Sequence, residues 1–101
     1  MTIRGLIEIV ESGKWPDGLW IPAPFTDKPE TGLLVQDAFH GSLDAAKALH
    51  DALLPGWWAM LRHSTRPMVT VGDIDAVQEA QDDSLSRAWL LAILRALEGD
   101  A

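Results

Sequence analysis

The stretch SLDAAKALHDALLPGWWAML, residues 42–61, predicts a helix, a turn and the start of a strand. Ser42 is a suitable N-cap, because its hydroxyl accepts a hydrogen bond from a free N–H of the first helical turn. Apolar residues then recur at helical spacing, which predicts an amphipathic helix over about 42–54. The side expected to face water carries Lys47, His50 and Asp51.

The helix is expected to end where Pro55 removes a backbone N–H and Gly56 permits a turn. The apolar, aromatic residues that follow predict a strand over 57–62. Adjacent residues of a strand point to opposite faces, so Trp57 and Trp58 cannot both enter the same core. The sheet is therefore expected either to be covered on both faces or to offer one face to a partner.

A second strand is predicted over 68–71, where β-branched residues alternate with others in MVTV. The short polar connection HSTRP, residues 63–67, suits an antiparallel hairpin 57–62/68–71. Beyond it, residues 73–83 carry five acidic and no basic side chains. Ile74 and Val77 in that run predict a weak helical turn.

Three further helices are predicted from apolar periodicity and capping residues. They lie at about 3–12, at about 30–39, where a strand over 32–35 is the alternative, and at about 84–98 with Ser84 as its cap. The last helix is apolar nearly all round. It is therefore expected to be central in the fold or to meet a second chain.

Residues 14–29 contain four prolines, which forbid a regular helix. The segment is too hydrophobic for a flexible linker, so we predict an ordered loop that packs Trp15 and Trp20 on the body of the domain. A recognition loop is the alternative, because tryptophan is enriched in binding surfaces.

Together these elements predict one α+β domain over residues 1–101, with a small antiparallel sheet packed with helices in a sandwich-like arrangement. The absence of cysteine excludes disulfides and cysteine-based metal sites. A net charge of −7 argues against direct DNA binding. No apolar run is long enough for a membrane span or signal peptide. The absence of cysteine agrees with a cytoplasmic protein.

The sequence contains no pattern typical of a catalytic or metal site, so we expect no enzyme activity and no cofactor. One metal site can be imagined from His63, Asp73 and Asp75, although the histidines of the chain show no ligand spacing. The favoured interpretation is that these three residues are solvated side chains in turns and do not bind a metal.

The segment 42–61, followed by SLSRAWLLAILRALEG, resembles the phage ABA sandwich domain family. The matching positions are Ser42, Leu43, Asp44, Ala45, Ala46, Ala48, Leu49, Pro55, Gly56 and Trp57. The adjacency of Pro55 and Gly56 departs from the family pattern, which has a residue between them. The resemblance implies a phage or prophage origin and a fold, and it supplies no catalytic residues.

We therefore expect a phage or prophage accessory protein that binds a host or phage protein in the bacterial cytoplasm. Inhibition of a host defence system, such as a CRISPR effector, is one version, in which ordered acids occupy a phosphate-binding groove. The alternative is a homo-oligomeric structural or virion-associated protein, with a homodimer formed through residues 84–97. The candidate partner-binding residues are Trp15, Trp20, Trp58, Asp73, Asp75, Glu79, Asp82 and Asp83.

Overall fold

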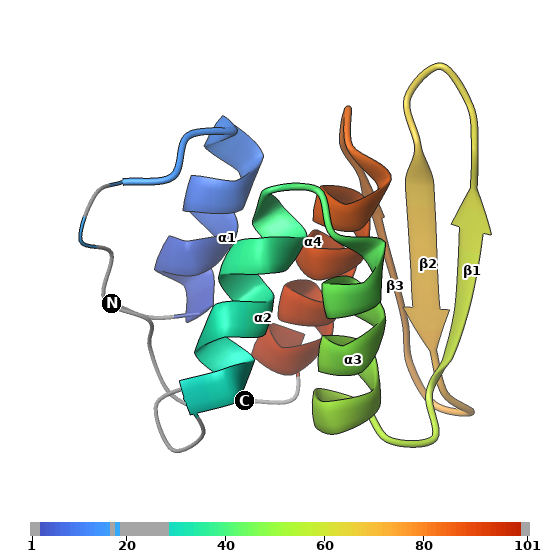
Figure 1. Ribbon diagram of the computed structural model, residues 1–101. Helices are drawn as coiled ribbons and strands as arrows, with labels where there is room; N and C mark the ends of the chain where they lie inside the picture. Colours follow the sequence, from blue (N-terminus) through green and yellow to red (C-terminus); the bar gives the residue numbers. More distant parts are fainter. Residues whose placement is uncertain (1–2, 17, 19–28, 100–101) are drawn as a thin grey trace.

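The computed structural model describes residues 3–16, 18 and 29–99. They form four helices and one three-stranded antiparallel sheet, which confirms the α+β class (Figure 1). In chain order the elements are α1 Ile3–Ser12, α2 Pro29–Phe39, α3 Leu43–Leu53, β1 Trp58–Arg62, β2 Met68–Gly72, β3 Val77–Gln81 and α4 Leu85–Gly99.

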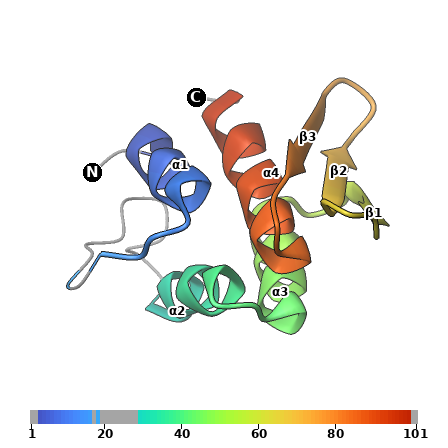
Figure 2. The ribbon, with the colours of Figure 1, turned by 90° about the horizontal axis from the view of Figure 1, so that it is seen from above.

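Helix α4 lies in the middle of the molecule, between the sheet and the other three helices (Figures 1 and 2). It packs on β2 and β3 on one side and on α1, α2 and α3 on the other. Ten of its fifteen residues are buried. This central position explains why α4 is apolar nearly all round, and it corrects the idea that residues 84–97 offer their apolar surface to a second chain.

The sheet is a meander in the order β1-β2-β3. Its inner face packs on α4 through side chains that are almost fully buried, namely Val69, Val71 and Ala80. The register places Met60 opposite Thr70, and Thr70 opposite Glu79. Because side chains alternate along a strand, these three residues share the opposite, outer face.

The predicted hairpin is present, with β1 beginning one residue later and β2 ending one residue later than expected. The predicted helical turn within residues 73–83 is wrong, because residues 77–81 form the third strand. Asp73 explains the difference. Its Oδ1 accepts hydrogen bonds from the N–H groups of Asp75 and Ala76, at 2.8 Å each, and this side-chain bonding makes a tight β-turn rather than a helix.

The ambiguous segment 30–39 is helical, as α2. Trp15 packs on the end of this helix, with its ring centroid 4.9 Å from that of Phe39. The packing predicted for the start of the Trp- and Pro-rich loop is therefore present. Trp20 and most of the rest of that loop lie outside the described residues.

Helix α3 begins as predicted, since Ser42 Oγ accepts a hydrogen bond from the N–H of Ala45 at 3.0 Å. His50 differs from the prediction that it faces water, because it is only 4% exposed. Its Nδ1 lies 3.2 Å from Nε1 of Trp89, and its Nε2 lies 2.9 Å from the carbonyl oxygen of Trp57. His50 thus belongs to the buried side of α3 with the apolar residues of that helix, and its polar ring is accommodated there by these two hydrogen bonds.

Candidate functional site

The outer sheet face and the adjoining β2–β3 turn carry four of the six large apolar side chains that are exposed among the residues that the structure describes. The face comprises the outward side chains of the three strands, and no described helix lies over it (Figures 1 and 2). Its apolar members are widely exposed, at 45% for Trp58, 50% for Met60 and 56% for Val77. Isolated apolar side chains at a surface are ordinary, whereas a contiguous group of them indicates a contact surface.

Strand register makes this group contiguous. Trp58 pairs with Gly72, and Gly72 pairs with Val77, so these residues form one row across the sheet. Gly72 leaves room for the Trp58 indole, because a Cβ atom there would lie 2.6 Å from Cζ2 and 2.9 Å from Cε2 of the ring. The indole therefore lies over β2 instead of standing out into solvent, and the row is a shallow, firmly held apolar strip.

Ile74 extends the strip at the same end of the sheet. It lies in the turn between β2 and β3, directly after Gly72, and is 98% exposed. An aliphatic side chain at the tip of a tight turn contributes nothing to the core. Its exposure beside the Trp58 row therefore enlarges the candidate contact surface.

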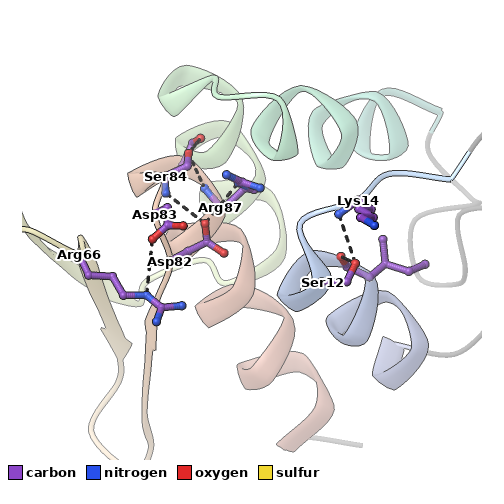
Figure 3. Close-up of polar contacts among 9 residues, drawn as sticks. Ser12, Lys14, Arg66, Asp82, Asp83, Ser84 and Arg87 are labelled. Carbon is purple, nitrogen blue, oxygen red and sulfur yellow. Dashed lines mark hydrogen bonds and ion pairs between the residues drawn. The ribbon is translucent and has the colours of Figure 1, made fainter.

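The acidic residues of the run 73–83 divide into two groups. Asp73 shapes the turn through the hydrogen bonds described above. Asp82 is 7% exposed; its Oδ1 accepts the N–H of Ser84 at 3.1 Å and lies 3.3 Å from Nε of Arg87 (Figure 3). Both carboxylates are therefore used inside the fold, where they fix a turn and the start of α4.

The remaining acids of the run, Asp75, Glu79 and Asp83, are exposed. Glu79 lies on the outer sheet face beside Thr70, and Asp75 follows Ile74 in the turn. Asp83 lies 3.9 Å from Nε of Arg66, in an ion pair that is open to solvent (Figure 3). The acids next to the apolar strip are thus Asp75 and Glu79.

A hollow of about 500 Å³ lies away from the sheet face, where the end of α1 meets the end of α2 and the start of α4. Trp15, Phe39 and His40 line it together with Arg87. The guanidinium carbon of Arg87 lies 5.4 Å from the centre of the Phe39 ring, and its Nε faces Asp82. The charge of Arg87 is thus paired with Asp82, and the hollow lies at the junction of three helices.

The metal arrangement considered from the sequence is wrong. His63 lies in the connection between β1 and β2, whereas Asp73 and Asp75 lie in the connection between β2 and β3. These connections are at opposite ends of β2, so the three side chains cannot share an ion. Within residues 3–16, 18 and 29–99, no three histidine or acidic side chains gather as metal ligands would.

The structure places the predicted partner-binding residues in different surroundings. Trp58, Asp75 and Glu79 lie together at the outer sheet face, Trp15 packs on α2, and Trp20 is outside the described part of the chain. Sequence reasoning missed Met60, Val77 and Ile74. The alternation of outward Val77 and Glu79 with inward Gln78 and Ala80 was the one available signal for an outward row on a third strand.

Comparisons with protein families, characterised proteins and solved structures found no match to this chain. None of the described helices combines the length and apolarity needed to cross a bilayer. The residues of the outer sheet face are therefore the basis for a functional proposal.

Proposed function

We propose that this protein works by binding another protein through the outer sheet face. The observation that carries the proposal is the row formed by Trp58, Gly72 and Val77, with Met60 and Ile74 beside it. The side chains of Trp58, Met60 and Val77 are exposed at 45% or more on paired strands, and Ile74 is exposed in the adjoining turn. Fixed aromatic and aliphatic side chains suit binding, because little conformational entropy is lost when a partner covers them.

The charges beside the strip indicate the chemistry of the partner. Asp75 and Glu79 flank it on the β3 side, Arg62 lies at its β1 end, and the chain carries a net charge of −7. A partner with an apolar contact surface and basic residues at its rim would gain both burial of apolar area and electrostatic attraction. Basic proteins, including those that bind nucleic acids, have surfaces of this kind.

This chemistry fits the accessory role that the family resemblance implies, in which a phage or prophage protein acts in the cytoplasm of a bacterial host. An inhibitor of a host defence protein is one form of that role. Only two exposed acids of the described residues 73–83, Asp75 and Glu79, lie next to the strip. Two acids suit a contact at the rim of an interface rather than occupation of a whole phosphate-binding groove. Origin, location and target rest on the resemblance and remain predictions.

The test compares Val77→Lys with Leu33→Lys. Both exchange an exposed aliphatic side chain for lysine, but Leu33 lies on α2, away from the sheet, and is 61% exposed. Each tagged protein is used to capture proteins from a bacterial lysate, and any protein retained by the wild type is then purified for direct titration. A true partner should bind Leu33→Lys like wild type and Val77→Lys about thirtyfold or more weakly, because the new lysine places a charge within the apolar strip. Equal binding by both variants, or loss in Leu33→Lys alone, would contradict the proposed surface.

A further inference from the structure

The two edges of the sheet differ in how they are covered. Along β3, helix α4 packs closely, and Nη1 of Arg95 donates a hydrogen bond to the carbonyl oxygen of Glu79 at 2.8 Å. Along β1, β2 is the only described element with extensive contact. As a result Ala59 is exposed even though it points toward the helical side of the sheet.

The sequence of β1, WAMLR, carries none of the usual protection of a strand edge. It has no proline, lysine or acidic residue, and all five residues pair in regular register with β2, without a bulge. Its only charge is Arg62, at the end of the strand. Natural proteins generally guard an edge with such features, because the free N–H and C=O groups of an edge strand can pair with another strand.

We propose that a second copy of this chain covers this edge. In the arrangement we infer, β1 pairs antiparallel with β1 of the second copy about a two-fold axis through Met60, and the two sheets join into one of six strands. The inference does not rest on the proposed function, because it is argued from the uncovered backbone edge of β1, although Trp58 and Met60 belong to the outer sheet face as well.

The strand is complementary to itself in this register. Trp58 lies opposite Arg62 of the second copy, and a guanidinium group beside an indole ring is a favourable cation–π pair. Met60 lies opposite its own copy on the axis. The two arginines fall at opposite ends of the paired strands, so the only charges in the interface do not repel each other directly.

The inner side of the pairing is complementary as well. Ala59 lies opposite Leu61 of the second copy, below the sheet on the helical side. Leu61 is only half-buried in one copy, and Ala59 is exposed. The pairing therefore covers apolar surface on both sides of the strand while it satisfies the free backbone groups along the edge.

The size of the contact sets the expected strength. A five-residue strand edge is short, so the interface should lie at the low end of specific interfaces, below about 1,200 Å² in total. We expect a reversible dimer with a Kd of about 1–100 μM, which corresponds to about 5.5–8 kcal/mol of binding free energy.

Sedimentation velocity over concentrations from about 1 to about 500 μM tests the dimer. Met60→Lys places two ammonium groups opposite each other on the axis, and Ala59→Lys places a charge against Leu61 below the sheet. Because both positions are exposed in one copy, both variants should keep the wild-type circular dichroism spectrum. Each should raise the dimer Kd about tenfold or more, whereas Val77→Lys on the far strand should leave it unchanged.

Hydrogen exchange supplies a second measurement on the wild-type protein. The amides of residues 58–62 that point away from β2 should become better protected as concentration rises, while those of β3 should not change. A monomer at every concentration would overturn the inference. So would a dimer that Val77→Lys abolishes and Ala59→Lys preserves, because that result would indicate face-to-face stacking of two outer sheet faces. Ala59→Lys lies off the outer face, so it separates loss of the dimer from loss of the partner proposed above.

Discussion

Trp89 donates a hydrogen bond from its indole Nε1 to Nδ1 of His50, at 3.2 Å, inside the protein. An indole nitrogen only donates, so Nδ1 must accept and the imidazole proton must lie on Nε2. That N–H donates to the carbonyl oxygen of Trp57, at 2.9 Å. One neutral imidazole thus joins α3 to the central helix and to the residue that leads into the sheet.

Replacing either member of this pair should lower stability. His50→Ala removes both hydrogen bonds and leaves a cavity, so we expect a loss of about 2–4 kcal/mol in the free energy of unfolding. Trp89→Phe leaves Nδ1 of His50 without a donor and should cost about 1–3 kcal/mol. Urea denaturation followed by circular dichroism measures both values.

The double variant His50→Ala/Trp89→Phe should lose about 1 kcal/mol less than the sum of the two single losses, because the shared bond is removed only once. His63→Ala is the matched control, since His63 is exposed in a turn, and it should change stability by less than about 0.5 kcal/mol. Strict additivity of the two buried substitutions would argue against the bond.

Gly72 is required by the indole of Trp58. In Gly72→Ala the new methyl would lie 2.6 Å from Cζ2 of that ring and 3.0 Å from the carbonyl oxygen of Ala76. We expect a loss of about 1–3 kcal/mol, measured by thermal or urea denaturation. In a Trp58→Ala background the same substitution should cost less, because only the backbone contact remains.

Gly99→Ala is the control for that experiment. Gly99 ends α4, and a Cβ atom there would meet only Nε2 of Gln78, at 3.8 Å. Alanine favours a helix over glycine, so this variant should be neutral or more stable by up to about 1 kcal/mol. A Gly72→Ala protein that is as stable as Gly99→Ala would contradict the packing of the indole on β2.

Asp82 and Asp83 are neighbours in the sequence, but their replacement by alanine should lower stability by different amounts. Asp82→Ala removes the hydrogen bond to Ser84 N–H at the start of α4 and the partner of the half-buried Arg87, so it should cost about 1–3 kcal/mol. Asp83→Ala removes only an exposed ion pair and should cost less than about 0.5 kcal/mol. Equal losses in urea denaturation would show that charge alone, rather than the buried contact, matters here.

In the exposed pair Lys47 and Asp51 on α3, each group shifts the pKa of the other. The hydrogen bond from Lys47 Nζ to Asp51, at 2.9 Å, lowers the pKa of the Asp51 carboxyl and raises the pKa of Lys47. The stabilising effect of the depressed carboxyl is present above its unfolded-chain pKa and is lost as pH falls through its folded pKa. The effect on the lysine side is present below its unfolded-chain pKa and is lost as pH rises through its folded pKa.

Carbon-detected NMR titration of Asp51 measures this coupling. The midpoint should rise toward the ordinary aspartate range in Lys47→Met and should not move in Lys14→Met, which removes an exposed lysine elsewhere. An unchanged midpoint in Lys47→Met would show that the ion pair does not persist in solution. Such a result would leave the core contacts of α3 unaffected, because both groups are exposed.

The sequence contained enough information for the helices and the first hairpin. Ser42 and Ser84 mark helix starts through hydrogen bonds that depend on local sequence, and apolar spacing marks the buried faces. The third strand was missed because QEAQ is polar and because Ile74 and Val77 mimic helical spacing. Its formation depends on pairing with β2 and on the Asp73 turn, and strand pairing is a non-local interaction.

The site was predictable only in part for the same reason. Strand geometry correctly separated Trp57, which packs at the core, from Trp58, which faces outward. That Gly72 would lie under the indole, and Val77 beside it, depends on the register of strands distant in sequence. The burial of His50 depends on where α4 and the end of α3 meet, and no local pattern encodes that meeting.

The central place of α4 has a consequence for biosynthesis. The helix on which every other layer packs is the last of the described elements in the chain, so the ribosome produces it after all of them. Until it is made, α1, α2 and α3 lack their common support, and the inner face of the sheet, with Val69 and Val71, has nothing to cover it. Folding should therefore be completed only after residues 85–99 are available, in one late step, and the earlier part of the nascent chain should depend on chaperones to keep its apolar faces from aggregating.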